Sequence, residues 1–450
     1  IQNFSEIIDG GYVYLDKTKL LYDLVHNGKI YFLSRPRRFG KSLLISTLEC
    51  YFQGKKELFK GLAIEQLEKK WKQYPVFHID FNGKNFTQAG ELEKTLQTFV
   101  ETQELNYGRN PLANTLGDRF MAVLKAAHEK TGLGAVVLID EYDKPLLDVL
   151  DTGLKTFDSE GNERLLEDRH REIMKGFYSV FKAADRDLKF VLLTGVTKFS
   201  QVSVFSGFNQ PDDISMDDRY EALCGITEEE LYSVFDEQIK AMAARYKVSE
   251  DEMKYRLKRK YDGYHFSPSM LDIYNPFSLL NALDAQDLSC FWVSSGATSM
   301  LPKFVDNMEL RLRNFENCPI LRKTLESSDV INGGAELFLY QTGYLTIKSS
   351  DEFGYFLGFP NQEVKQALYE VVLPSLTMKS ESDIISLQGS LFRQLGTGQI
   401  ADAMKTLKAL VADVPYSNKK LASMDMEERY RLIISTILNA IGLKVEVEHM

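Results

Sequence analysis

Residues 29–42 decide the fold, and they read Lys29-Ile30-Tyr31-Phe32-Leu33-Ser34-Arg35-Pro36-Arg37-Arg38-Phe39-Gly40-Lys41-Ser42. The first six residues are rich in β-branched and aromatic side chains, which favours a short buried strand. Residues Lys41–Phe52 carry apolar side chains at helical spacing, so we expect a helix there. A strand, a basic loop and a helix in this order form the setting in which phosphate-binding loops occur.

The basic loop matches most of the motif G-x-x-x-x-G-K-[ST] of such loops. Gly40, Lys41 and Ser42 fit it, whereas Arg35 stands at the first glycine position, so the first turn must close without glycine. Backbone N–H groups at a helix start face bound phosphates, and the helix dipole favours their negative charge. We expect Lys41 to reach the β- and γ-phosphates and Ser42 to bind Mg²⁺.

The expected nucleotide-binding set comprises Arg35, Pro36, Arg37, Arg38, Phe39, Gly40, Lys41, Ser42 and Leu43. Its three arginines would add positive charge around the phosphates. The alternative is a basic loop that contains Gly-Lys-Ser by chance, and the flanking strand and helix argue against it.

A second motif follows the apolar run Val136–Ile139, which ends in Asp140 and Glu141. This is a Walker B pattern: we expect Asp140 to hold Mg²⁺, directly or through water, and Glu141 to polarise the attacking water. The alternative is a buried strand followed by ordinary surface acids. Because both motifs occur in the right order, each at a strand end, the sequence predicts binding of a nucleoside triphosphate, with ATP and Mg²⁺ as the expected cofactors.

Further strands are expected at Gly134–Asp140, Pro75–Phe81 and Leu188–Thr194, with helices over 90–130 and Arg171–Ala184. This alternation predicts a doubly wound α/β P-loop NTPase domain with a parallel sheet. We also expect a short strand around Tyr12 and Tyr14.

Two features favour an ATPase over a small-molecule kinase. Glu141 supplies a carboxylate that activates water, which kinases do not need, and Pro75–Phe81 would be an extra central strand between the motif strands. Thr194 ends its strand and joins Lys41 and Glu141 in the expected catalytic set as a sensor of the γ-phosphate. A hydroxyl that merely caps the strand end is the alternative.

Beyond residue 225 helical periodicity dominates, so a mainly helical region should follow the nucleotide domain. The expected divisions are residues 1–225, the ATPase domain; 226–330, a helical lid; 331–420, a helical or winged-helix-like region; and 421–450, the start of a further domain. Thr227 followed by three glutamates is typical of a helix N-terminus.

Composition excludes several classes of protein. The formal net charge of −10 argues against a surface that binds nucleic acid throughout, and the four cysteines form no C-x-x-C pair. We see no leader segment, and the apolar runs are too short to cross a bilayer, so we expect a cytoplasmic protein without a membrane partner. The six histidines show no metal-binding spacing, so Mg²⁺ is the one metal expected. The basic run Lys254–Lys260 follows acids and favours a solvated helix face over a nucleic-acid contact.

Several segments resemble the predicted AAA-ATPase-like proteins of bacteria. They are Tyr31–Leu43, Leu138–Leu146, Thr194–Ser200, Tyr12–Thr18, Tyr261–Phe266, Tyr274–Leu280 and Thr342–Ile347. The resemblance implies that Arg at the first loop position is a regular feature of the family.

The resemblance also implies a nuclease-like domain of the PD-(D/E)XK type at the C-terminal end, of which Glu427–Ile441 and Gly442–Glu448 would be the first helix and strand. The chain ends before the metal-binding core of that domain, so we expect no nuclease chemistry in it. An ordinary terminal helix is the alternative for Glu427–Ile441.

The leading hypothesis is an AAA-like or signal-transducing ATPase whose nucleotide state positions the C-terminal region. A nucleotide-stabilised regulatory module with little hydrolysis is a second hypothesis, and the ATPase part of a nucleic-acid-processing nuclease is a third. Homo-oligomers, and nucleic acid bound through the missing C-terminal domain, are left open as partners beside the nucleotide.

Overall fold

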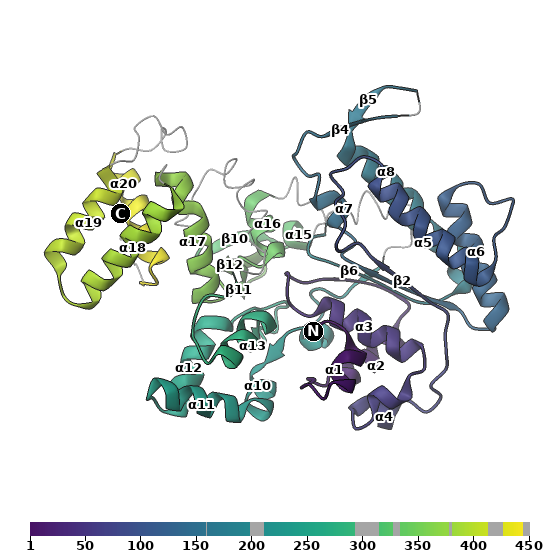
Figure 1. Ribbon diagram of the computed structural model, residues 1–450, viewed down its shortest axis with the longest axis horizontal. Coiled ribbons are helices and arrows are strands. Elements are labelled where there is room, and N and C mark those ends of the chain that lie inside the picture. Colours follow the sequence, from purple (N-terminus) through teal and green to yellow (C-terminus); the bar gives the residue numbers. More distant parts are fainter. Residues whose placement is uncertain are drawn as a thin grey trace. The chain divides into compact units, whose positions relative to one another are not determined.

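The computed structural model describes residues 1–158, 160–198, 211–292, 315–326, 334–377, 380–412 and 426–443. The chain divides into two compact units (Figure 1). Unit 1 comprises Ile1–Ile226, Phe266–Ser269 and Lys323–Gln341, and unit 2 comprises Thr227–His265, Met270–Arg322 and Thr342–Met450. The four-part division expected from the sequence stays a prediction.

Unit 1 is built on a five-stranded sheet in the order β2-β3-β6-β1-β7. All four neighbouring pairs of strands are parallel. The strands are β1 (Ile30–Ser34), β2 (Val76–Asp80), β3 (Ala135–Asp140), β6 (Leu188–Gly195) and β7 (Asp212–Asp213). Every residue of β3 is buried, as continuous apolar runs in parallel sheets are. The predicted fold class, an α/β domain with a parallel sheet followed by a mainly helical region, is confirmed.

Helices flank this sheet, with α5, α6 and α8 on one side and α1 to α4 on the other (Figure 1). Their bounds are α1 Phe4–Asp9, α2 Thr18–Asn27, α3 Lys41–Phe52, α4 Ala63–Leu67, α5 Glu91–Tyr107, α6 Leu116–Thr131, α7 Lys144–Leu147, α8 Leu166–Tyr178 and α9 Val180–Ala183. Short 3-10 turns occur at Lys56–Phe59, Asp185–Asp187 and Asp218–Leu223, and β4 (Lys155–Phe157) pairs with β5 (Glu163–Leu165) as a hairpin. Two helices of later sequence are α15 (Arg322–Glu326) and α16 (Gly334–Thr342).

The strand expected around Tyr12 and Tyr14 is wrong. Helix α1 ends at Asp9, before this stretch, and residues 12–14 form neither a strand nor a helix. Tyr12 and Val13 are both 58% exposed, so this stretch has no buried face to lay against a neighbouring strand.

The extra central strand is β6 and not β2. The expectation that Pro75–Phe81 lies between the two motif strands is therefore wrong. β6 lies between β3 and β1, whereas β2 is at the edge of the sheet. The burial of the two strands agrees with their places, since seven of the eight residues of β6 are buried and only two of the five residues of β2 are. Order along the chain does not determine order across a sheet.

Unit 2 is mainly helical. Its helices are α10 Glu228–Val234, α11 Asp236–Tyr246, α12 Glu250–Tyr261, α13 Pro276–Ala285, α17 Gln362–Thr377, α18 Glu381–Gly396, α19 Ile400–Ala412 and α20 Met426–Ala440. Thr227 and Glu230 cap α10 reciprocally, as the run of glutamates predicts. An antiparallel sheet in the order β10-β12-β11 accompanies these helices and consists of Cys318–Leu321, Gly354–Gly358 and Thr346–Ser350. Two-residue strands lie at Ile226–Thr227 (β8) and Ile273–Tyr274 (β9).

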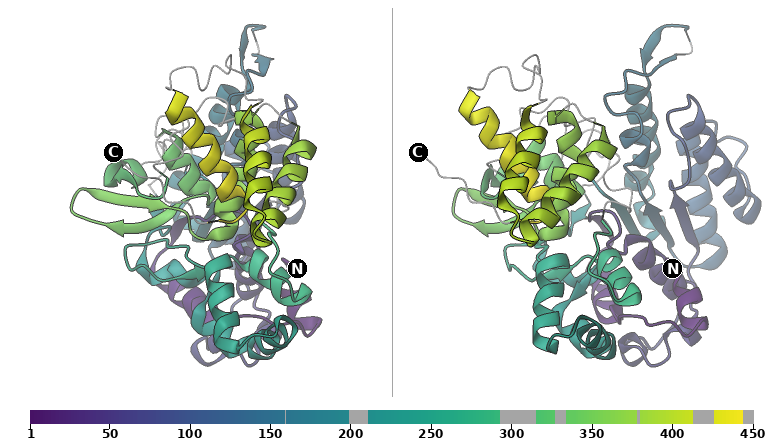
Figure 2. Two further views of the ribbon diagram at one scale, coloured as in Figure 1. Left: turned by 90° about the vertical axis from the view of Figure 1, so that its left-hand side faces the viewer. Right: turned by 60° about the vertical axis from the view of Figure 1, so that its left-hand side comes forward.

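The C-terminal helices α17 to α20 lie next to one another in both further views (Figure 2). Helix α20 covers most of the helix expected at Glu427–Ile441, while residues 444–448 of the strand expected at Gly442–Glu448 lie outside the described residues. The winged-helix-like region and the nuclease-like end therefore stay predictions. In the part of the chain that the structure describes, no helix has the length and apolarity needed to cross a membrane.

Candidate active site

The phosphate-binding loop connects β1 to α3. Gly40 adopts a left-handed backbone with φ of 94° just before α3, a conformation that favours glycine. Arg38 also has a positive φ, of 68°, so the loop is tightly wound. Lys41 is 7% exposed. Its Nζ donates to the carbonyl oxygens of Arg35 at 2.9 Å and Pro36 at 3.1 Å, which places the ammonium inside the curve of the loop.

Burial lowers the pKa of Lys41, and the nearby carboxylates of Asp140, Glu141 and Asp143 oppose that shift. The lysine of the first motif therefore interacts with the acids of the second. The loop carbonyls that it contacts are neutral, so phosphate oxygens would be stronger partners for the ammonium.

Arg35 lies at the base of the loop and is 1% exposed. Its backbone N–H donates to Gly195 O at 3.1 Å, and its Nη1 donates to Ser215 O at 2.7 Å. The guanidinium lies 4.0 Å from the ring centroid of Phe266, and the ring of Phe39 packs edge-on against the same ring. Arg35 thus supports the loop from the interior. Its φ is not positive, so the backbone at the first loop position does not require glycine. Its role in nucleotide binding stays a prediction, as do those of half-buried Arg37 and exposed Arg38.

The second motif lies at the carboxyl end of β3. Register pairs Ile139 with Leu193 on β6, so Thr194 comes beside Asp140. The hydroxyl of Thr194 donates to Asp140 Oδ1 at 2.6 Å, and the N–H of Glu141 donates to the same oxygen at 3.0 Å. The sheet therefore brings together two residues that the sequence separates by more than fifty positions.

Glu141 has a left-handed backbone with φ of 51° and is half-buried. Non-glycine residues rarely adopt this conformation, and residues with a strained backbone cluster at functional sites. Burial raises the pKa of Glu141, with Asp143 and Asp140 adding to the shift and Lys41 opposing it. A carboxylate with a raised pKa is a better proton acceptor than an ordinary one.

Asp143 is a site residue that the sequence reasoning missed. Its Oδ2 accepts three hydrogen bonds, from Val196 N at 3.0 Å, Thr197 N at 2.7 Å and Thr197 Oγ1 at 2.7 Å. The carboxylate is 1% exposed, and burial raises its pKa although the bonds from Thr197 lower it. The sequence did carry a signal for Asp143, because it is a third acid only three residues after Asp140. Asp143 fixes the segment after Thr194 to the end of β3.

Lys198 lies in the segment that follows Thr194, and its ammonium is buried. Its partner is a carboxylate, Asp213 Oδ2 at 2.7 Å on β7. Its backbone N–H donates to Gln341 Oε1 at 2.9 Å. The following residues of the motif, Phe199 and Ser200, lie outside the described residues.

Comparison with known proteins gives the family. A family model described as predicted AAA-ATPase matches residues 1–205. A protein of Azotobacter chroococcum mcd 1, named as an uncharacterized protein in the vnfD 5' region, is 32% identical over 456 residues, which span 100% of this chain and 83% of that protein. The chain belongs to the predicted AAA-ATPase family. Membership in this predicted AAA-ATPase family indicates nucleotide binding and ATPase activity in general terms.

The residues of this predicted AAA-ATPase site fit a magnesium ion. Mg²⁺ is usually held by one or two protein oxygens, with phosphates and water completing its shell. Ser42 in the first turn of α3 and the buried carboxylate of Asp140 supply a hydroxyl and a carboxylate of this kind. Asp80, which the sequence reasoning also missed, lies beside Asp140 at the end of the neighbouring strand β2. Within the described residues no group of three or more His, Cys, Asp or Glu forms a separate metal site.

Proposed function

We propose that this protein binds ATP with Mg²⁺ at the Arg35–Leu43 loop and hydrolyses it to ADP and phosphate. The observation that carries the proposal is the meeting of Lys41, Asp140, Glu141 and Thr194 at the carboxyl edge of one parallel sheet. Ligands of open α/β sheets bind at this edge. The family to which the chain belongs supports the same activity.

Each residue would have a separate task in the reaction. Lys41 would exchange its loop carbonyls for oxygens of the β- and γ-phosphates, and Ser42 and Asp140 would hold Mg²⁺, which neutralises phosphate charge. Glu141 would orient a water and take its proton as the water oxygen bonds to the γ-phosphorus and the bond to the β,γ-bridging oxygen breaks. Thr194 would sense the γ-phosphate through its hydrogen bond to Asp140.

We further propose that the nucleotide state positions the region beyond residue 225. Asp143 ties the segment after Thr194 to the end of β3, and Lys198 in that segment donates to Gln341 on α16. A shift of Thr194 on loss of the γ-phosphate would therefore reach α16. Such coupling requires that the two states bind nucleotide with different affinities.

Binding and steady-state hydrolysis of ATP with Mg²⁺ test the site, with the parent chain beside Lys41→Ala and Glu141→Gln. We expect Lys41→Ala to lose binding and Glu141→Gln to bind without turnover. If the parent binds ATP but does not turn it over, the chain is a nucleotide-held module and the hydrolytic proposal fails. Identical hydrogen-exchange patterns beyond residue 225 with ADP and with a non-hydrolysable ATP analogue would contradict the proposed coupling.

A further inference from the structure

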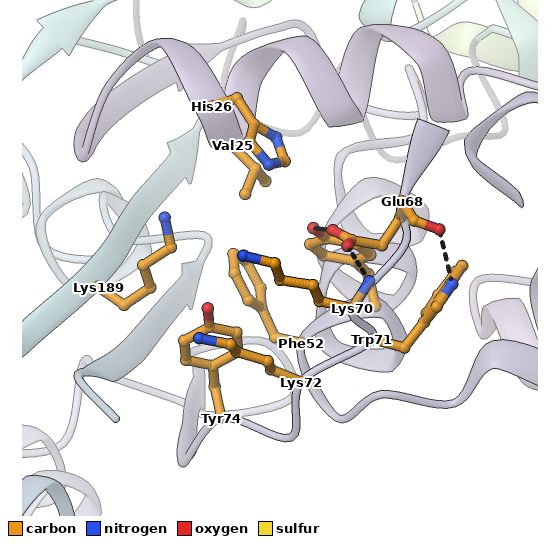
Figure 3. Close-up of a pocket in the computed structure, with 10 residues that line it drawn as sticks. Val25, His26, Phe52, Glu68, Lys70, Trp71, Lys72, Tyr74 and Lys189 are labelled. Atoms are coloured by element: carbon orange, nitrogen blue, oxygen red, sulfur yellow. Dashed lines mark hydrogen bonds between the residues drawn. The ribbon is translucent and has the colours of Figure 1, made fainter. Parts of the chain in front are cut away.

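A cavity of unit 1 lies at the opposite end of the sheet from the phosphate-binding loop (Figure 3). It has a volume of about 200 Å³ and is lined by the end of α2, the segment between α4 and β2, and the start of β6. Lys189 is the second residue of β6 and Thr194 the seventh, so roughly 16 Å of strand separates this cavity from the candidate active site.

Three ammonium groups face the cavity. Lys70, Lys72 and Lys189 direct their side chains into the same space, and His26 lies at its edge (Figure 3). Within the described part of the chain, none of the three lysines has a carboxylate within 4.0 Å of its Nζ. The cavity therefore concentrates positive charge in a protein whose net charge is −10.

One acid, Glu68, lines the cavity, but its oxygens are already engaged. Oε2 accepts from the hydroxyl of Tyr51 at 2.6 Å, and Oε1 accepts from the backbone N–H of Lys70 at 2.7 Å. Glu68 thus fixes the walls of the cavity rather than pairing with an ammonium. Burial lowers the pKa of Lys189, and repulsion from Lys72 adds to this while Glu68 opposes it. A bound anion would relieve that repulsion.

The backbone of the cavity wall is also strained at one residue. Trp71 has a positive φ of 38°, which is costly for a residue with a side chain. Its Nε1 donates to Glu68 O at 3.1 Å, and its ring packs against Tyr51 and Phe59. The backbone of this segment is thus held in a conformation in which Lys70 and Lys72 extend towards Lys189, whereas the indole of Trp71 lies on the side of Glu68 (Figure 3).

We propose that this cavity binds the phosphate groups of a small phosphorylated ligand, at a site separate from the phosphate-binding loop. Three ammonium groups against one engaged carboxylate suit a diphosphate better than a single negative charge. The cavity is small, which favours inorganic pyrophosphate or the phosphates of a nucleotide over a larger partner. Its place at the amino ends of the strands lets it be occupied independently of the active site.

The test is a titration of the full chain with inorganic pyrophosphate, followed by the emission of Trp71. The chain has two tryptophans, so Trp292→Phe isolates the reporter, and Lys41→Ala removes the phosphate-binding loop as a site. We expect a saturable change in emission. The double variant Lys70→Gln, Lys189→Gln should lower the affinity for pyrophosphate at least tenfold. The matched control is Lys69→Gln, an exposed neighbour that does not line the cavity, and it should change the affinity less than twofold.

No saturable response, or an equal response in the Lys70→Gln and Lys189→Gln variant, would overturn the proposal. A response that is present with Lys41 intact and lost in Lys41→Ala would also overturn it, because the ligand would then be in the phosphate-binding loop. A parallel titration with ADP identifies the source: tighter binding than pyrophosphate points to a nucleotide, and equal or weaker binding to free pyrophosphate. If Trp292→Phe does not fold, calorimetry on Lys41→Ala with both tryptophans makes the same comparisons.

Discussion

Asp143 joins the two strands that carry the candidate catalytic residues. Replacing it with alanine would leave the buried N–H groups of Val196 and Thr197 without their acceptor. Each such loss costs about 1–3 kcal/mol, so we expect Asp143→Ala to lower the free energy of unfolding of unit 1 by roughly 2–6 kcal/mol in urea titrations. The control is Glu163→Ala, which removes an exposed ion pair with Lys155 and should cost no more than about 0.5 kcal/mol. Equal losses in the two variants would argue against the role given to Asp143.

A second prediction at the residue scale concerns Asp262 of unit 2. It is 1% exposed, and burial raises its pKa from 3.8 to about 6, although the N–H of Gly263 and the ammonium of Lys258 oppose the shift. Between these two pKa values the folded state binds more protons than the unfolded state, so stability falls as the pH rises from about 4 to 6 and stays lower above that.

Asp262→Asn cannot ionise and should lose this part of the pH dependence. We expect the variant to be more stable than the parent at pH 7, by an amount of the order of 1–3 kcal/mol. The gain should shrink as the pH falls towards 4. Urea unfolding followed by Trp292, in a Trp71→Phe background, measures the transition of unit 2. An unchanged difference between parent and variant at pH 4.5 and pH 7 would contradict the prediction.

At the scale of elements, the end of β6 lies very close to the turn that follows β3, and Gly195 is the residue that allows this close approach. A Cβ built on Gly195 would lie 2.6 Å from ring atoms of Tyr142 and 2.7 Å from Asp143 Oδ1. These atoms belong to buried side chains that cannot move freely, so we expect Gly195→Ala to cost about 1–3 kcal/mol and to displace Thr194 from Asp140. Its expected signature is a lower kcat for ATP together with a lower urea midpoint.

Gly176 offers a matched comparison for that substitution. It is exposed within α8, and a Cβ there would have no atom within 4 Å. Alanine is the better helix former, so Gly176→Ala should raise the stability by about 0.5–1 kcal/mol and leave kcat unchanged. Loss of stability in both variants would mean that the crowding at Gly195 is not the cause.

At the scale of the whole molecule, nucleotide binding should stabilise unit 1 by mass action. At a concentration one hundred times the Kd, a ligand adds about 2.7 kcal/mol to the free energy of unfolding. We expect ATP with Mg²⁺ to raise the temperature of the thermal transition followed by Trp71 in the double variant Lys70→Gln, Lys189→Gln, in which the lysine-lined cavity is weakened as a competing site. Adding Lys41→Ala to this variant should abolish the shift.

The same experiment can follow Trp292 as a reporter of unit 2. A shift of that transition with ATP would support coupling between nucleotide state and the region beyond residue 225. If the Trp71 transition does not move, ATP does not bind at the loop under these conditions, and the proposed function fails.

Several parts of this protein are predictable from short stretches of its sequence. The run from Ile30 to Ser42 specifies a strand, a loop and a helix, because side-chain periodicity and the need for glycine at Gly40 are local properties. The same is true of the strand that ends at Asp140 and of the cap at Thr227. The α/β fold class followed from the alternation of these elements.

Which elements are neighbours could be known only from the tertiary structure. It placed β6, and not β2, between the motif strands, so that Thr194 reached Asp140. It also turned the guanidinium of Arg35 into the interior against Phe266, more than two hundred residues away in the sequence. Lateral order in a parallel sheet depends on which strand can be buried on both faces, and that is a property of the packed whole rather than of any one segment.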